Sequence, residues 1–266
     1  MIVPNLASAW RYRHFIASSI RGEIRARFIR SKLGGLWMIV HPLAQAAIFT
    51  LVLAGIMSAK LPGMANDRSA YALYLLSGLL AWSLFAELVN RCLTLFIDNA
   101  NLLKKMQFPR ICLPIIVAGS ALLNNILLFL AVLVVFALFG RLPEAGIAWV
   151  PVLMLLTLAL GLAIGLMLGV FNVFVRDVGQ IVPVALQFGF WLAPITYTPD
   201  IVPAPLRRLL YLNPMTAMVQ GYQNALLFGT PPDVTALAWL ALLAALLVVL
   251  ALTLFRRASP EMADVL

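Results

Sequence analysis

Few side chains in this chain could do chemistry, and one acid–base pair stands out among them. Glu87 lies four residues before Arg91 inside a long apolar stretch. A spacing of four places both side chains on one face of a helix, and an unpaired charge inside a membrane is costly. We therefore predict an intramembrane ion pair between Glu87 and Arg91 that stabilises the bundle, with a channel or gate role as the alternative.

No catalytic or metal-binding pattern accompanies this pair. The chain has neither a G-x-x-x-x-G-K-[ST] phosphate loop nor an H-E-x-x-H zinc motif. Cys92 and Cys112 are not in ligand spacing, so we expect neither a disulfide framework nor a cysteine-based metal site. A proton-coupled carrier or an intramembrane enzyme would need more ionisable groups than these. We therefore expect that the chain is not an enzyme.

The composition is typical of a membrane protein. The chain has 266 residues, of which 63% are apolar and 11% charged, and its mean hydropathy is +1.00. A soluble domain has roughly 45–50% apolar and about 25% charged residues. Several charge-free runs reach the roughly 18 residues that indicate a spanning helix, whereas the strands of a barrel alternate. We predict an all-α polytopic membrane protein.

Six transmembrane helices and re-entrant half-helices are expected to position the polar residues. The stretch 209–229 is broken by Pro214, Gly221 and Gly229, and such a segment is tolerated at membrane depth only when it packs against protein or lines a wet cavity. We predict periplasmic half-helices within 200–230, although counting this stretch as a span would give seven crossings. The predicted spans are 35–59, 70–96, 112–139, 147–174, 178–198 and 234–255.

Basic residues set the predicted orientation. The formal net charge is +9, and with six spans 13 of the 19 Lys and Arg residues fall on one side and 5 on the other, with Arg91 inside a span. By the positive-inside rule both termini are then cytoplasmic, and no nucleic acid is needed to explain the charge. Seven spans would move Arg256 and Arg257 outside and weaken this bias. No N-terminal signal peptide is expected.

Residues 1–32 combine basic side chains with an apolar stripe of period four. We predict a cytoplasmic interfacial amphipathic helix on an anionic leaflet, with a solvated, topology-setting tail as the alternative. A transmembrane domain over 33–257 and a cytoplasmic tail over 258–266 complete the chain. The stripe consists of Tyr12, Ile16, Ile20, Ile24 and Phe28.

Several segments together resemble ABC-2-type polysaccharide exporter permeases, closest to the Wzm-type permeases of O-antigen export, with capsule and teichoic-acid exporters as relatives. The similarity covers nearly the whole chain. The segments that carry it are Arg25–Pro42 (basic helix and entry to the first span), Leu76–Phe85 (second span), Asn101–Pro114 (cytoplasmic loop), and Arg176-Asp177, Pro194–Tyr197 and Leu212–Thr216 in the later half.

The resemblance implies an activity and a set of partners. Two copies of the chain would form a homodimeric pore in the bacterial inner membrane, with two separate ABC ATPase subunits bound beneath it. ATP hydrolysis there would drive a lipid-linked polysaccharide from the cytoplasmic to the periplasmic side among the membrane lipids. The chain itself would hold no cofactor, because ATP and Mg bind to the partner. The alternatives are an ABC-2 permease for a small drug-like substrate and, from another class, an ion-coupled carrier or a membrane-embedded enzyme.

In this family the loop after the second span docks on the ATPase, which corresponds here to residues 98–110. The residue types agree, because Pro109 ends a helix and Phe108 offers an apolar knob beside basic residues. The alternative is an ordinary topology-setting loop. The predicted coupling residues are Asn101, Leu102, Lys104, Lys105, Phe108, Pro109 and Arg110.

The residues that line the pore are predicted from the resemblance and from the chemistry of sugar binding. Sugar rings stack on aromatic side chains and their hydroxyls bond to amides, and family members line the pore with spans one and five. Phe188 and Trp191 are helical neighbours on span five, although interface belts and helix packing also use such residues. The predicted pore lining is Gln45, Phe49, Gln187, Phe188, Trp191 and Tyr197; the predicted periplasmic exit is Tyr211, Tyr222, Gln223 and Asn224; and the basic residues predicted to meet a lipid headgroup or pyrophosphate are Arg25, Arg27, Arg30 and Lys32.

Overall fold

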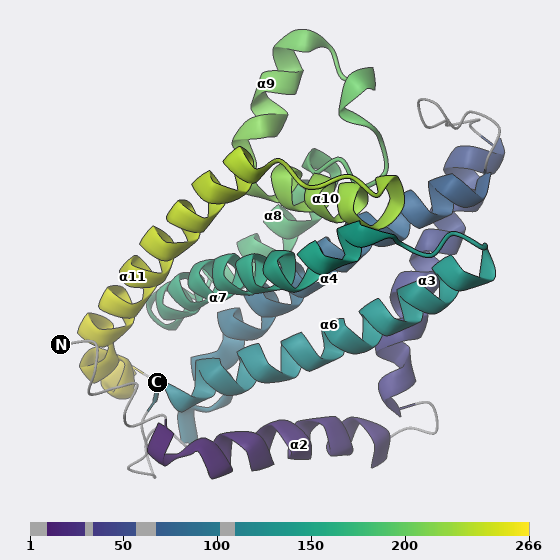
Figure 1. Cartoon of the computed structure of the whole chain (residues 1–266). Helices are drawn as coiled ribbons and strands as arrows, with labels where there is room; N and C mark the ends of the chain where they lie inside the picture. The colour runs from purple at the N-terminus through teal and green to yellow at the C-terminus, as the bar shows by residue number, and fades with distance from the viewer. Residues whose placement is uncertain (1–9, 30–33, 57–67, 102–109, 266) are drawn as a thin grey trace.

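The computed structural model describes residues 10–29, 34–56, 68–101 and 110–265. Every regular element among these residues is helical (Figure 1), which confirms the predicted all-α class. Helices suit a bilayer because each one satisfies its own backbone groups. The α-helices are α2 (Arg13–Ile29), α3 (Trp37–Phe49), α4 (Arg68–Asp98), α6 (Cys112–Leu138), α7 (Val150–Phe174), α8 (Val178–Leu192), α9 (Ala204–Leu212), α10 (Pro214–Gln223) and α11 (Val234–Val265).

Four described helices, α4, α6, α7 and α11, are long and apolar enough to cross a membrane. Two shorter apolar helices cover Ile39–Leu53 and Val178–Leu192. The 15 residues of α8 extend about 22 Å at 1.5 Å per residue, which is less than the roughly 30 Å of a hydrocarbon core. The count of six spans therefore stays a prediction. For six spans, the two short helices would also have to cross the membrane, each together with the residues next to it.

Two helix ends differ from the predicted span ends. α8 stops at Leu192, before the predicted boundary at residue 198, and Ala193 is extended at φ −98° and ψ 141°. Pro194 follows, and a proline disfavours the helical conformation of the residue before it. α11 instead continues to Val265, past the predicted boundary at residue 255, with Pro260 inside it.

α4 lies at the centre of the bundle and packs most extensively against α7, with further contacts to α6, α10, α3 and α8. Gly161, Gly165 and Gly169 form a strip on α7 that faces Leu88 and Cys92 of α4. Small residues four positions apart allow two helix backbones to approach closely in a membrane. Of the residues in the most apolar 18-residue stretch of each helix, 72% are buried in α4 and 22% in α11.

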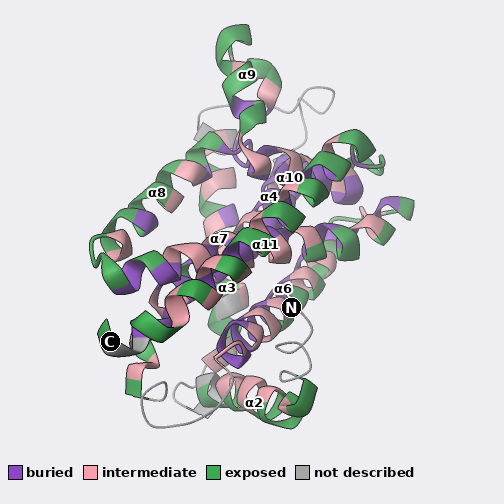
Figure 2. Cartoon of the chain, turned by 90° about the vertical axis from the view of Figure 1, so that its left-hand side faces the viewer, coloured by how far each residue is buried: buried purple, intermediate pink, exposed green. Residues whose placement is uncertain are grey.

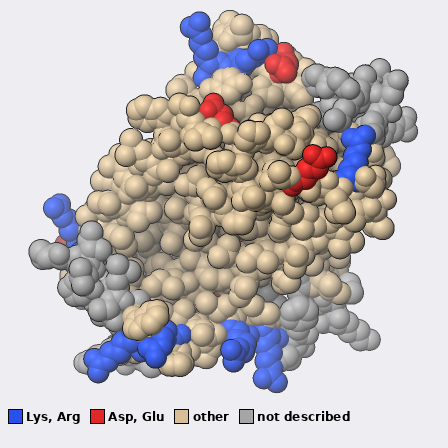
Figure 3. Space-filling view, viewed as in Figure 1, with Lys and Arg blue, Asp and Glu red and all other residues tan. Residues whose placement is uncertain are grey.

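The two ends of the bundle differ in charge. α2 lies along the lower end in Figure 1, and α9 stands at the upper end. Figure 3 shows basic side chains along the lower edge of this face, whereas the upper end carries both signs of charge. Figure 2 shows that α9 is largely exposed. This asymmetry agrees with a cytoplasmic end at α2, because cytoplasmic segments of membrane proteins are enriched in Lys and Arg.

Candidate functional site

One face of α8 presents the aromatic and amide side chains that were predicted to line a pore. Gln187 is exposed, and the exposed fractions of Phe188 and Trp191 are 67% and 52%. Val182 and Phe190 are buried against the bundle. The outward face of α8 therefore offers ring faces for stacking and an amide for hydrogen bonding.

The structure brings predicted pore residues of α3 and α8 together. The ring centroid of Phe49 lies 6.1 Å from that of Trp191 and 5.9 Å from that of Phe190. Phe190 also meets Trp82 of α4 edge-on at 5.9 Å, and tilted or edge-on geometries are the favoured ones for aromatic pairs. Gln45, one turn before Phe49, is partly buried. These rings tie α3 to α8 and leave Trp191 half-exposed.

The turn after α8, residues 193–198, is held by two tyrosines of α4. The hydroxyl of Tyr71 donates to the carbonyl oxygen of Thr196 at 2.6 Å. The hydroxyl of Tyr74 lies 3.0 Å from the carbonyl oxygen of Pro194. A turn has carbonyl groups that no helix satisfies, and an unpaired one costs several kcal/mol at membrane depth. Neither tyrosine was predicted from the sequence; the available signal was two phenols, three positions apart in an apolar stretch, that each need a partner.

Tyr197 and Gln223, predicted at the pore and at the exit, take part in the same turn. The hydroxyl of Tyr197 donates to the carbonyl oxygen of Trp191 at 3.0 Å, and its own carbonyl oxygen lies 2.9 Å from the hydroxyl of Tyr74. The side-chain amide of Gln223 donates to the carbonyl oxygen of Pro194 at 3.0 Å. Both residues therefore shape the turn.

We expect Tyr74→Phe to destabilise the protein by about 1–3 kcal/mol, because buried carbonyl oxygens lose a donor while the ring packing is kept. Each kcal/mol corresponds to about 2–4 °C in melting temperature for a chain of this size. Thermal unfolding in detergent measures the effect. Tyr211→Phe is the matched control, since that side chain is 57% exposed. Equal melting temperatures for the two variants would contradict this role of Tyr74.

The predicted exit residues are separated in the structure. Tyr222 is fully buried and Gln223 is 2% exposed, whereas Tyr211 on α9 points outward. Asn224 is partly buried and begins a π-helical segment, Asn224–Phe228. Tyr222 and Gln223 pack inside the bundle of this single chain, and an exit role for these residues stays a prediction.

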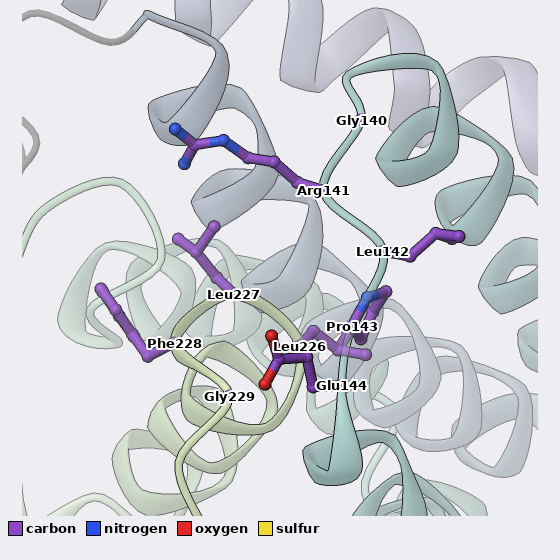
Figure 4. A pocket seen from close by; sticks show the side chains of 9 residues that line it. All are labelled: Gly140, Arg141, Leu142, Pro143, Glu144, Leu226, Leu227, Phe228 and Gly229. Atoms are coloured by element: carbon purple, nitrogen blue, oxygen red, sulfur yellow. The ribbon is translucent and has the colours of Figure 1, made fainter.

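A polar pocket lies where α6 ends (Figure 4). It has a volume of about 360 Å³ and is formed by the segments 140–144 and 226–229. Gly140 begins the first segment and Gly229 ends the second, with φ of 67° and 64°. Glycine adopts this left-handed conformation without strain. Arg141 and Glu144 line the pocket, so it combines a donor and an acceptor. This pocket was not predicted from the sequence.

Glu87 and Arg91 belong to a larger polar cluster that joins three helices. Nη1 of Arg91 lies 3.4 Å from Oε1 of Glu87. On α6, Ser120 accepts a hydrogen bond from Arg91 at 2.8 Å, and Asn124 donates one to Glu87 at 2.7 Å. Glu23 of α2, which the sequence analysis did not single out, lies 2.6 Å from Nη2 of Arg91. The cluster therefore links α2 to the bundle.

The edges of the predicted coupling loop are described, and its centre is not. Asn101 is exposed at one edge. At the other edge, Arg110 donates to the backbone carbonyl oxygen of Ser259 and, at 2.9 Å, to its hydroxyl. The last turns of α11 therefore stand beside the end of the loop. The coupling residues outside the described part of the chain are Leu102, Lys104, Lys105, Phe108 and Pro109.

The basic residues predicted to meet headgroups are described only in part. Arg25 is exposed on α2, and Arg27 belongs to the same helix. Arg30 and Lys32 lie outside the described residues. Across the described part of the chain, no group of three or more His, Cys, Asp or Glu side chains is placed to hold a metal ion.

The chain is similar to one family of transporters and to several proteins named for export or transport of polysaccharides. The model of the family described as ABC-2 type transporter matches residues 15–227, from α2 into the π-helical segment after α10. The O-antigen export system permease protein RfbA of Myxococcus xanthus is 28% identical over 257 residues, 96% of each chain. A protein of the same name from Klebsiella pneumoniae is 25% identical over 92% of each chain. The polysialic acid transport protein KpsM of Escherichia coli is 24% identical over 90% of this chain and 92% of that protein.

Proposed function

Because the chain belongs to the ABC-2 type transporter family, we propose that it is the permease subunit of an exporter for a lipid-linked polysaccharide. The observation that carries this proposal is the similarity, over nearly the full length, to permeases named for O-antigen export. A relative named for polysialic acid transport supports the same substrate class. In the proposal, the polymer moves from the cytoplasmic to the periplasmic side of the inner membrane, and both termini are cytoplasmic.

The outward face of α8 supports a sugar substrate. Phe188 and Trp191 are exposed rings next to the exposed amide of Gln187, and an aromatic ring offers an apolar face to the C–H groups of a sugar while the amide bonds its hydroxyls. In a homodimer we expect the two α8 faces, with Phe49 of each α3, to enclose the pore. The same faces in a single chain would be exposed, as they are here.

A separate ATPase supplies the energy in this proposal and binds the ATP and Mg. The chain contains no phosphate-binding loop of its own. Residues 98–110 form the docking loop, and the contact between Arg110 and Ser259 adds the end of α11 to the same surface. A basic docking surface also speeds association with an acidic partner.

Charge reversal in the docking loop tests the partner. We expect the Lys104→Glu/Lys105→Glu double variant to lose the ATPase that co-purifies with the wild-type chain in mild detergent, at least about tenfold, since like charges across an interface cost several kcal/mol. The measurement is the ATPase activity and the stoichiometry of the purified complex.

The matched control is Lys60→Glu/Arg208→Glu, which reverses two charges predicted on the periplasmic side and should keep the ATPase. A wild-type chain that purifies without any ATP-hydrolysing partner and still transports would overturn the proposal. Retention of the ATPase by the docking-loop variant would instead move the coupling site elsewhere.

A further inference from the structure

Two described contacts attach the N-terminal helix α2 to the bundle. One is the ion pair between Glu23 and Arg91 of α4, at 2.6 Å. The other is the packing of Ile20 onto Gly119 of α6, where a Cβ atom at position 119 would lie 2.5 Å from Cδ1 of Ile20. α2 therefore depends on both α4 and α6 for its position, and the absence of a side chain at Gly119 is what permits this close approach.

Among the described residues, Arg91 has partners on α2, α4 and α6, and its partner on α2 is Glu23. Its guanidinium also lies 3.4 Å from Glu87 and donates to Ser120 at 2.8 Å. The side chains of Arg91 and Glu23 are 21% and 36% exposed. If the charge of Glu23 is removed, Arg91 still has a carboxylate and a hydroxyl inside the bundle. Loss of Glu23 therefore weakens the attachment of α2 without leaving a buried charge unpaired.

These contacts lie close to the loop that connects α4 and α6. Arg91 is two helical turns before the end of α4 at Asp98, and Ser120 is about two turns after the start of α6 at Cys112, so each lies roughly 10–12 Å along its helix from the loop. A rigid helix transmits displacement of its end over such a distance. A shift of the helix ends at Asp98 and Cys112 would therefore reach the groups that hold α2.

We infer that the Glu23–Arg91 ion pair transmits movement of the docking loop to α2. The inference rests on the proposed function, in which an ATPase displaces this loop as it binds nucleotide. α2 exposes Arg21 and Arg25, so its movement repositions a basic surface that faces anionic headgroups at the inner leaflet. Glu23 is accordingly a positioning residue. Through it, the nucleotide state of the partner changes the position of the basic surface of α2, which an anionic lipid carrier meets first.

A cysteine pair reports the position of α2 directly. Ile20→Cys removes the side chain that occupies the space beside residue 119, and Gly119→Cys then places a second thiol within reach for a disulfide. Cys92 and Cys112 are both buried and free and are replaced by alanine in this background. The experiment measures the rate of cross-linking by a mild oxidant in the full complex in membranes, with and without ATP and vanadate.

We expect rapid cross-linking without nucleotide and a change of at least about threefold on nucleotide trapping. Glu23→Gln should slow the nucleotide-free reaction at least about threefold and remove its nucleotide dependence, while ATP hydrolysis and complex assembly persist. Glu144→Gln, the same substitution at an exposed carboxylate beyond the far end of α6, is the matched control and should behave as the parent.

The outcomes separate the inference from the proposed function. Cross-linking that is equal in the parent and in Glu23→Gln, with the ATPase bound, overturns the role of Glu23. A nucleotide-independent rate in the parent overturns the transmission while the exporter assignment stands. A chain that binds no ATPase contradicts the proposed function, and with it the transmission.

Discussion

Gly169→Leu is expected to leave almost no folded protein in the membrane. A Cβ atom at this position would overlap the carbonyl oxygen of Cys92 and lie 3.1 Å from its carbonyl carbon. A backbone group cannot move aside as the end of a flexible side chain can, so α7 would have to separate from α4 along the strip of Gly161, Gly165 and Gly169. Overpacking costs about 1–3 kcal/mol in ordinary cores and occasionally more.

We expect the upper end of that range or beyond for Gly169→Leu, because α4 and α7 form the most extensive contact of the bundle and folded proteins have only about 5–15 kcal/mol to lose. The measurement is the yield of monodisperse protein after detergent extraction, which should fall at least about tenfold, together with its melting temperature. Gly22→Leu is the matched control, since nothing lies within 4 Å of a Cβ atom there. A Gly169→Leu variant that behaves like this control would show that the two helices are not closely packed.

Trp191→Ala is expected to reduce surface polysaccharide about twofold to twelvefold while the complex still assembles. The residue is 52% exposed, and its ring contacts those of Phe49 and Phe190. The hydrogen bond from Tyr197 goes to the backbone carbonyl, which the variant keeps. An aromatic contact contributes about 0.5–1.5 kcal/mol, and each 1.36 kcal/mol of barrier changes a rate tenfold.

The export assay compares this variant with Trp239→Ala. Trp239 is 68% exposed on α11, far along the chain from the predicted pore, so its removal should leave export unchanged. Export at the parental level from Trp191→Ala, at equal amounts of assembled complex, would remove Trp191 from the pore lining. Equal losses in both variants would indicate a general effect of losing an exposed tryptophan.

Hydrophobic runs and helix-breaking residues carried most of what the sequence predicted about the fold. Long charge-free runs have only helical solutions in a bilayer, and α4, α6, α7 and α11 follow these runs. Pro214 and Gly229 fall where the sequence indicates breaks, since α10 begins at Pro214 and Gly229 caps the π-helical segment at φ 64°. The break predicted at Gly221 was wrong, because Gly221 lies inside α10. These predictions depend on local rules, so a single sequence was sufficient for them.

Contacts between distant residues were harder to predict. The spacing of Gly161, Gly165 and Gly169 was visible as a small-residue repeat, but the sequence analysis did not use it. Glu23 looked like one acid among many basic residues, because its partner Arg91 is 68 positions away. Tyr71 reaches the turn at Thr196 over 125 positions. No local rule connects such residues, and only the packed bundle shows which partner each one finds.

The position of α4 at the centre of the bundle also matters during synthesis. α4 is complete at Asp98, but its main packing partner α7 ends 76 residues later, at Phe174. At roughly 5–20 residues per second, this interval is about 4–15 s. During that time the side of α4 that faces the glycines of α7 has no partner. Ser120 of α6, which accepts from Arg91, is made earlier in the interval, 22 residues after Asp98. Glu23 is made before all of them, so this counter-charge outside α4 already exists when Arg91 leaves the ribosome.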